Sequence, residues 1–335
     1  MRRSPYPSRT LAGLLAFSCL LLAPSAAAAK GDVFKLTDPR GDDCGDGTLV
    51  YPLRDDLKPG DLDLLSFSAH VTKYGTEFEA VFARPIAYPA RQTIDAVGTS
   101  LGDVARFGFY TFNIDIYIDM DHVAGSGSMS SLPGRKVTIA SASAWEKAII
   151  LTPRPYEAEE IFKQSLAKTA KDELKARKPR VDKEDVELLK KEIAAQVARS
   201  VYFPTRVRVS GSTVRFEVPD DFLGESAKDT WGYVVTVSGA DMRQKFNIPV
   251  INKAQIGGPG VMILPILPGR SQEAFGGARE DDALQPPLVD IIVPAGMKQE
   301  DILKDYDLVQ QRPVALPGVV PAAEKAAGSG AAPKR

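Results

Sequence analysis

Short segments in which apolar and polar residues alternate recur along this chain, and they limit its possible folds more than any other feature. Residues 64–70 alternate around Phe67 and Ala69, and residues 77–83 alternate around Phe78 and Phe82. Such alternation is typical of β-strands with one buried face. Further strand candidates, separated by turns with Gly or Pro, are residues 107–119, 137–140, 145–152, 205–210, 213–218 and 233–238. Because helices do not alternate with these strands, the pattern predicts a mainly β fold, an antiparallel, immunoglobulin-like β-sandwich.

One segment, residues 155–200, departs from this pattern and is rich in Lys, Glu and Ala. Its apolar residues recur at helical spacing in two runs, which are Phe162, Leu166, Ala170 and Leu174, then Val186, Leu189, Ile193 and Val197. Asp182 precedes the second run, where it can cap a helix. We therefore expect an α-helical hairpin inserted between strands. Its apolar stripe needs cover, either from the sheet of the same chain or from a protein partner that binds residues 155–200.

The first 29 residues have the pattern of a secretory signal peptide. Three Arg residues precede an apolar stretch over residues 11–23, and small residues lead up to Ala29. The apolar stretch is too short to span a bilayer as a helix. Cys19 raises the alternative of a lipoprotein, but the bulky Phe17 disfavours acylation at that position. We expect an exported protein, periplasmic or extracellular, that does not span a membrane.

The remainder divides into a folded domain over residues 30–312 and a tail over residues 313–335. The tail is dominated by Pro, Ala and Gly and is predicted to be disordered. The formal net charge is −1, and without residues 1–29, which hold three Arg and no acidic residue, it becomes −4. A nucleic-acid binder needs a clustered Lys and Arg excess, so this class is excluded. Two His and two Cys leave little material for zinc or iron–sulfur sites.

The most distinctive local feature is an acidic, glycine-rich loop over residues 38–47, here called the acidic loop. It carries the carboxylates of Asp38, Asp42, Asp43 and Asp46. Carboxylate oxygens in tight turns can bind a hard cation, so we predict a structural Ca²⁺ site here. The alternative is that these Asp side chains cap turns.

A second acidic turn ends the strand candidate at residues 107–119. Asp119 and Asp121 belong to this turn and contribute ligands only if it folds beside the acidic loop. An ordinary β-turn explains the same two residues. The cation site therefore has two candidate sources of ligands, residues 38–46 and residues 119–121.

The catalytic motifs in the sequence are weak. Residues 98–102 match the G-x-S-x-G pattern, but that motif needs a later Asp and then a later His, and His122 is the only later His. A pair of carboxylates for glycoside hydrolysis is a tertiary arrangement, and no pair stands out in the sequence. Trp145 and Trp231 are the only tryptophans and each begins a strand candidate. An exposed Trp can stack on a sugar ring; burial in the sandwich is the alternative.

Several segments, taken in order, resemble the C-terminal domain family of glucodextranase, an SLH-like binding module. They are residues 38–52 (DPRGDDCGDGTLVYP), 59–65 (PGDLDLL), 115–121 (DIYIDMD), 132–135 (LPGR), Trp145, 231–233 (WGY), 289–292 (VDII) and 299–303 (QEDIL). The resemblance implies a β-sandwich related to family 9 carbohydrate-binding and DOMON-type domains. It also implies non-catalytic binding of a glycan or cell surface, and it favours a cation at the acidic loop.

The chain departs from that family's pattern at two places. The helical segment at residues 155–200 is not part of the pattern, and residues 84–88 (RPIAY) replace an aromatic stretch before the long strand. We expect an exported, non-enzymatic, calcium-stabilised module that binds a polysaccharide or cell-envelope glycan, with Trp145 and Trp231 as candidate ligand-binding residues. The alternative is a structural or assembly protein of the envelope that binds a protein partner through residues 155–200. A glycosidase with unrecognised carboxylates is the third hypothesis.

Overall fold

The computed structural model describes residues 31–89, 100–178, 180–242, 262–279 and 284–329. The predicted signal peptide, with Cys19, and the first two residues of the G-x-S-x-G match lie outside the described residues. Of the residues that the structure describes, 30% lie in strands and 24% in helices, so the prediction of a mainly β fold is confirmed. The strands form antiparallel sheets that do not close into a barrel.

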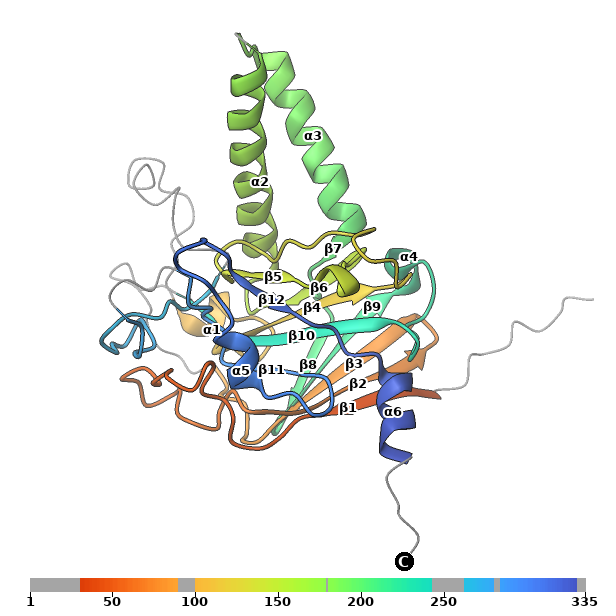
Figure 1. Ribbon diagram of the computed structural model, residues 1–335, viewed down its shortest axis with the longest axis vertical. Coiled ribbons are helices and arrows are strands. Elements are labelled where there is room, and N and C mark those ends of the chain that lie inside the picture. Colours follow the sequence, from red (N-terminus) through yellow and green to blue (C-terminus); the bar gives the residue numbers. More distant parts are fainter. Residues whose placement is uncertain (1–30, 90–99, 179, 243–261, 280–283, 330–335) are drawn as a thin grey trace, which may run out of the picture.

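The first sheet has five antiparallel strands in the order β1-β2-β3-β9-β8 (Figure 1). The bounds are β1 Gly31–Thr37, β2 Leu64–Thr72, β3 Gly75–Phe82, β8 Val207–Ser210 and β9 Thr213–Pro219. Strand β9 shows the period of two clearly, because Val214, Phe216 and Val218 are buried while the residues between them are half-exposed. Strand β1 was not among the strand candidates from the sequence.

The second sheet has five strands in the order β11-β10-β4-β6-β7, antiparallel except for the parallel pair β6 and β7. The bounds are β4 Phe112–Asp119, β6 Lys147–Leu151, β7 Val201–Tyr202, β10 Gly232–Gly239 and β11 Asp290–Ile291. A parallel pair of short strands, β5 Val137–Ile139 and β12 Val314–Leu316, lies beside this sheet (Figure 1).

The second sheet is covered on both faces, which explains why every residue of β4 and β10 is buried. On one face, Ile114, Ile116 and Ile118 of β4 join a hydrophobic cluster that also takes in side chains of the first sheet. On the other face, Tyr117 of β4 joins a second cluster with residues of β5, β12 and two long helices, α2 (Pro155–Arg177) and α3 (Lys183–Ser200). Polar residues on that second face must therefore find partners inside the protein.

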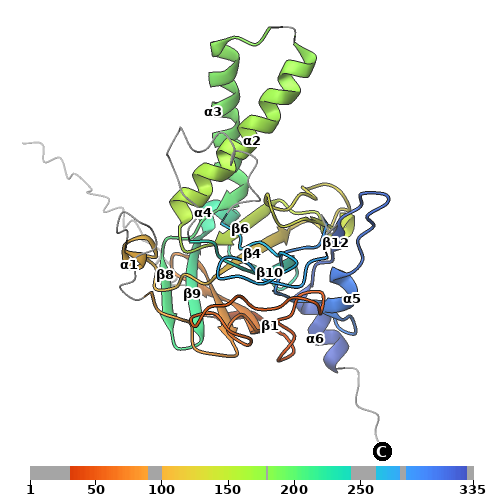
Figure 2. The ribbon, with the colours of Figure 1, turned by 90° about the vertical axis from the view of Figure 1, so that its left-hand side faces the viewer.

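The helices α2 (Pro155–Arg177) and α3 (Lys183–Ser200) follow β6 and precede β7 in the chain. They project together from the sheets, as both views show (Figures 1 and 2). Asp182 caps α3 by accepting a hydrogen bond from the Asp185 N–H, and the Asp185 carboxylate accepts one from the Asp182 N–H. Only the bases of the two helices are buried, through Ala158, Phe162, Ile193 and Val197.

The prediction of a disordered tail from residue 313 is wrong over residues 314–329. Val314–Leu316 forms β12, and Pro321–Ser329 forms α6. Between them, Val319 exchanges backbone hydrogen bonds with Tyr233 of β10. Three apolar residues of this segment, Val314, Leu316 and Val319, are buried against the rest of the fold. The Pro- and Ala-rich composition around them gave no sign of this burial. The remaining short helices are α1 Leu101–Val104, α4 Asp220–Leu223, α5 Gln299–Leu303 and the 3₁₀ turn Ser141–Ser143.

Candidate functional site

The acidic loop leaves β1 and packs against the start of β11, where it meets an acidic residue that is distant in sequence. One carboxylate oxygen from each of Asp38, Asp42 and Asp290 lies within 4.8 Å of the other two. Asp63, which precedes β2, borders this group and accepts a hydrogen bond from the Gly41 N–H at 2.9 Å. The Leu64 N–H donates to Asp290 Oδ2 at 2.6 Å, so β2 and β11 are joined at the same point.

Close backbone contacts hold the acidic loop in this place. The Gly45 N–H donates to the Val289 carbonyl at 2.9 Å, and Gln299 Nε2 donates to the Asp42 and Gly45 carbonyls at 2.6 and 3.1 Å. Gly45 has φ of +61°, and a Cβ there would lie 2.6 Å from the Leu288 carbonyl oxygen. Only glycine combines this conformation with this approach, so Gly45 allows the loop to reach β11.

Four carboxylates at this point have an oxygen that is buried and makes no hydrogen bond within the described part of the chain. These oxygens are Asp38 Oδ2, Asp42 Oδ1, Asp63 Oδ1 and Asp290 Oδ1. The exposed fractions of Asp63 and Asp290 are only 2% and 0%. Unpaired buried carboxylate oxygens are costly in free energy and therefore require an explanation.

The crowding also changes the acidities of these residues. Burial, with the charge of Asp42 next, raises the pKa of Asp38 to about 8. Burial raises the pKa of Asp42 to about 6 and, together with the charge of Asp38, raises the pKa of Asp290 well above its ordinary value. Without a counter-charge, this group of carboxylates resists full ionisation.

Asp43 and Asp46, also predicted as cation ligands, point elsewhere. Asp43 Oδ2 accepts hydrogen bonds from the Tyr51 hydroxyl and from the Gly60 N–H. Asp46 accepts from Thr48 N and Oγ1 and from Gln285 Nε2. The turn-capping alternative describes Asp46, which binds Thr48 two residues later, whereas Asp43 joins the loop to residues 51 and 60. Both residues lie outside the cluster of Asp38, Asp42 and Asp290.

The second acidic turn forms a separate cluster, Asp119, Asp121 and Glu146. Asp119 pairs with Gly232 on β10, whereas Asp290 pairs with Val237. These pairing positions are therefore separated by about 17 Å along β10, and they lie on opposite sides of that strand. Each carboxylate of this second cluster accepts hydrogen bonds, from the N–H groups of His122, Val123 and Met120 and from Ser126 Oγ. The predicted joint site with the acidic loop is therefore not formed.

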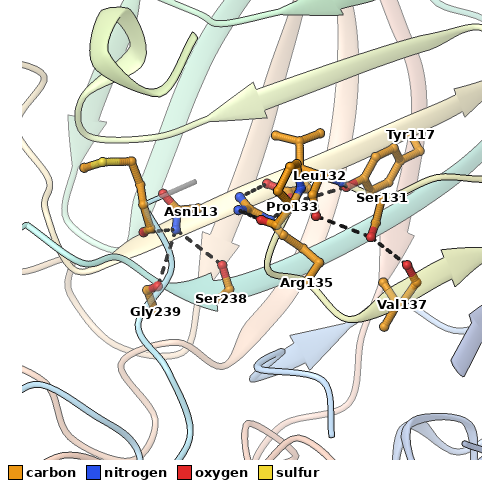
Figure 3. Close-up of polar contacts among 11 residues, drawn as sticks. Asn113, Tyr117, Ser131, Leu132, Pro133, Arg135, Val137, Ser238 and Gly239 are labelled. Atoms are coloured by element: carbon orange, nitrogen blue, oxygen red, sulfur yellow. Dashed lines mark hydrogen bonds and ion pairs between the residues drawn. The ribbon is translucent and has the colours of Figure 1, made fainter. Parts of the chain in front are cut away.

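The covered face of β4 carries a buried polar network (Figure 3). Arg135 donates from Nε and Nη2 to the two carboxylate oxygens of Asp115, at 2.6 and 3.0 Å. The Tyr117 hydroxyl donates to Asp115 Oδ2 at 3.3 Å and accepts from the Leu132 N–H at 3.0 Å. Further along β4, Asn113 Nδ2 donates to Ser238 Oγ and to the Gly239 carbonyl. Because Arg135 neutralises Asp115, this network fastens the 132–137 segment to the sheet.

Neither tryptophan offers a surface for sugar stacking, which corrects the prediction for Trp145 and Trp231. Their exposed fractions are 7% and 3%. Trp145 packs against Tyr117 with ring centroids 5.6 Å apart, and its Nε1 donates to the Ser130 carbonyl. Trp231 belongs to the cluster between the sheets. Both rings are therefore occupied by the core.

A comparison with protein families matches residues 33–318 to the SLH-like C-terminal binding module of glucodextranase. The chain belongs to this family. A search of curated proteins finds no match. The family match includes the acidic loop, Asp63, Asp290 and the helices α2 and α3, and it runs through β12.

Sequence reasoning found the acidic loop of this binding module but missed Asp63 and Asp290. Both residues lie in segments that carry the resemblance, residues 59–65 and 289–292. An aspartate inside the short apolar run of residues 289–292 was the available signal. Among the described residues, no helix is long and apolar enough to cross a membrane.

Next to the acidic loop, the module has an open cavity of about 420 Å³. Exposed Val50 and Leu53 give it an apolar wall, and Lys58 and Arg270 give it exposed cationic groups. Arg54, also in the lining, is held by Asp56 through two hydrogen bonds of 2.8 Å.

Proposed function

We propose that this chain is an exported, non-catalytic module that binds a carbohydrate or cell-envelope glycan. The observation that carries the proposal is the match of residues 33–318 to a binding-module family of glucodextranase. The two five-stranded sheets, which share one hydrophobic cluster, serve as the layers of an immunoglobulin-like sandwich, with α2 and α3 as the inserted hairpin. The signal-peptide pattern of residues 1–29 supports export to the periplasm or the cell exterior.

The glycan site in this proposal is the cavity beside the acidic loop. Sugars present apolar C–H faces together with many hydroxyl groups, so their sites combine apolar surface with fixed polar groups. Val50 and Leu53 supply the apolar surface, while Lys58 and Arg270 supply hydrogen-bond donors. The fixed guanidinium of Arg54 adds an oriented donor that loses little entropy on binding. The lining also holds one acidic residue, Asp55, which lies 3.9 Å from Lys58. Three cationic side chains against one acidic side chain leave a positive surplus, which favours glycans that carry carboxylate or phosphate groups.

A glycan array and co-sedimentation with purified envelope polysaccharides test the proposal. The expected result is retention on a subset of acidic glycans, weakened about tenfold or more in the Lys58→Ala, Arg270→Ala double variant, since it removes two charge-assisted contacts. The matched control is the Lys190→Ala, Arg199→Ala double variant, which removes the same charge from exposed positions on α3. Binding to no glycan refutes the function. Equal binding by the two double variants refutes the cavity as its location.

The projection of α2 and α3 favours one second candidate, an assembly role in the envelope. These helices are buried only at their bases, which leaves long faces free for a protein partner. Capture of the same envelope protein by the full chain, but not by a chain in which Gly-Ser replaces residues 163–192, supports this role. If capture does not depend on that segment, the assembly role is refuted.

A further inference from the structure

We propose that Asp38, Asp42 and Asp290 form the binding site of one Ca²⁺ ion, with Asp63 as an adjacent negative group. The ligands come from three separate parts of the chain, and only the fold brings them together. The proposal differs from the prediction based on sequence, because Asp43, Asp46, Asp119 and Asp121 are not among the ligands. It does not depend on glycan binding, since a module can hold a structural ion whatever its ligand.

The first observation is the convergence of three carboxylates without a cationic partner. One oxygen of each lies within 4.8 Å of the others. Among the described residues, no Lys or Arg forms an ion pair with Asp38, Asp42, Asp63 or Asp290, although Lys and Arg form sixteen ion pairs with other acidic residues. Like charges at this separation repel strongly in a buried setting. A divalent cation removes that repulsion.

The second observation is independent of the clustering. Asp290 is completely buried, and its Oδ1 makes no hydrogen bond within the described residues, while its Oδ2 accepts from the Leu64 N–H. Asp38 Oδ2 and Asp42 Oδ1 are unpaired in the same way. The nearby backbone donors Leu64 N–H and Gly41 N–H bind Oδ2 of Asp290 and of Asp63, and Oδ1 of both residues stays buried and unpaired. This arrangement fits a metal ion better than a turn cap, because a cap uses its oxygens on N–H groups.

The chemistry of the donors selects the ion. Only oxygen atoms converge here, which suits the hard cations Ca²⁺ and Mg²⁺ and disfavours zinc. Three carboxylates can supply up to about six oxygens, within the range of about 6–8 that Ca²⁺ takes. Mg²⁺ demands a near-ideal octahedron and prefers to keep its waters, which a site built from three rigid carboxylates does not favour. Exported proteins also meet far more Ca²⁺ than cytosolic ones.

An ion bound by Asp38, Asp42 and Asp290 would stabilise the fold by joining segments that are distant in sequence. It joins the acidic loop after β1 to the first residue of β11, and Asp290 is itself joined to the start of β2. An ion that binds only the folded chain stabilises it by mass action. The ion thus joins segments that are more than 200 residues apart in sequence.

Calorimetric titration of the full, EDTA-treated chain with CaCl₂ tests the proposal, and MgCl₂ is titrated for comparison. The expected result is one Ca²⁺ per chain, Mg²⁺ binding at least about tenfold weaker, and a melting temperature that rises with Ca²⁺. Asp290→Asn keeps the shape and the oxygen that accepts from the Leu64 N–H, and it should weaken Ca²⁺ binding by at least about tenfold. Asp121→Asn is the matched control in the second acidic cluster and should bind Ca²⁺ like the parent.

The opposite results are equally clear. If the chain takes up no Ca²⁺, if Asp290→Asn binds it unchanged, or if Asp121→Asn abolishes binding, the proposal is overturned. The rival explanation is that Asp38 and Asp290 share a proton, and it predicts equal melting temperatures in CaCl₂ and EDTA. Should Asp290→Asn not fold, Asp42→Asn in the partly exposed loop provides the same test. Ca²⁺ uptake and glycan binding are measured in separate assays, so a failure of one proposal can be told from a failure of the other.

Discussion

The buried pair of Arg135 and Asp115 provides the most direct test of how the second sheet is stabilised (Figure 3). Each residue is only 1% exposed, and the pair forms two hydrogen bonds. Arg135→Met retains most of the side-chain volume but removes the guanidinium. Within the described part of the chain, the buried Asp115 carboxylate then keeps one side-chain donor, the Tyr117 hydroxyl at 3.3 Å. We therefore expect a lower free energy of unfolding.

The magnitude follows from the burial. Removing one partner of a buried pair costs about 3–5 kcal/mol, because the other charge stays uncompensated in a low-dielectric surrounding. The free energy of unfolding of a folded protein is about 5–15 kcal/mol, so this single substitution removes a large part of the stability. Replacing both residues, as in Arg135→Met with Asp115→Leu, should recover most of the loss, because no charge remains buried.

Urea unfolding, monitored by circular dichroism, measures these differences in the free energy of unfolding. A shift in the midpoint urea concentration without a change in the m-value reports a change in stability. The control is Arg312→Met, since Arg312 pairs with Asp305 at 2.9 Å but both side chains are exposed. An exposed ion pair stabilises a fold far less than a buried one, because water screens the two charges. If Arg135→Met costs no more than Arg312→Met, or if the double replacement is worse than the single one, the reasoning about burial is wrong.

Three further predictions concern other parts of the molecule. In EDTA, the raised pKa values of Asp38 (about 8) and Asp42 (about 6), against 3.8 for an ordinary aspartate, mean that the folded chain holds more protons than the unfolded chain between about pH 4 and 8. The melting temperature in EDTA should therefore be highest near pH 4 and fall as the pH rises to 8; a rise over this window contradicts the assignment. The charged groups that surround these two are Asp43, Asp63, Asp290, Glu300 and Arg40. Phe162→Ala, at the buried base of α2, should lower the free energy of unfolding by about 3 kcal/mol in urea, whereas Leu188→Ala, exposed on α3, should change it by less than about 0.5 kcal/mol. Trp145→Phe should lower the urea midpoint, since it leaves a gap beside Tyr117 and removes the bond to Ser130, yet the folded variant should bind glycans like the parent; weakened binding by a fully folded variant would restore Trp145 as a ligand residue.

Much of the fold was predictable where one physical pattern dominated a segment. The strands β2, β3 and β9 have one face in the core, and their alternation survives in the sequence. Strand β11 has only two residues and depends on its pairing with β10, so it leaves almost no local pattern. Strand β12 is held by a tertiary pairing with β5 and lies in a segment whose composition indicated disorder.

The candidate site was predictable only in part, for a similar reason. The acidic loop is local, and its carboxylates are visible in ten consecutive residues. Which of them point inward is decided by tertiary partners, such as Tyr51 for Asp43 and Gln285 for Asp46. Asp290 reaches the loop only because β11 pairs with β10, and no spacing rule relates residues so distant. Local sequence thus identifies the loop, whereas the sheet order identifies the ligands.

The two proposed sites share one loop, and this makes their coupling testable. Asp43 follows the proposed ligand Asp42 and accepts hydrogen bonds from the Tyr51 hydroxyl and the Gly60 N–H. Tyr51 lines the cavity, and Gly60 follows Pro59 in its rim. An ion at Asp42 should therefore hold the cavity wall in its binding geometry, so glycan affinity should fall in EDTA and return with CaCl₂. In the Asp290→Asn variant, glycan affinity should be low in both conditions. If Ca²⁺ raises the melting temperature of the parent but leaves its glycan affinity unchanged, the ion stabilises the fold without ordering the cavity.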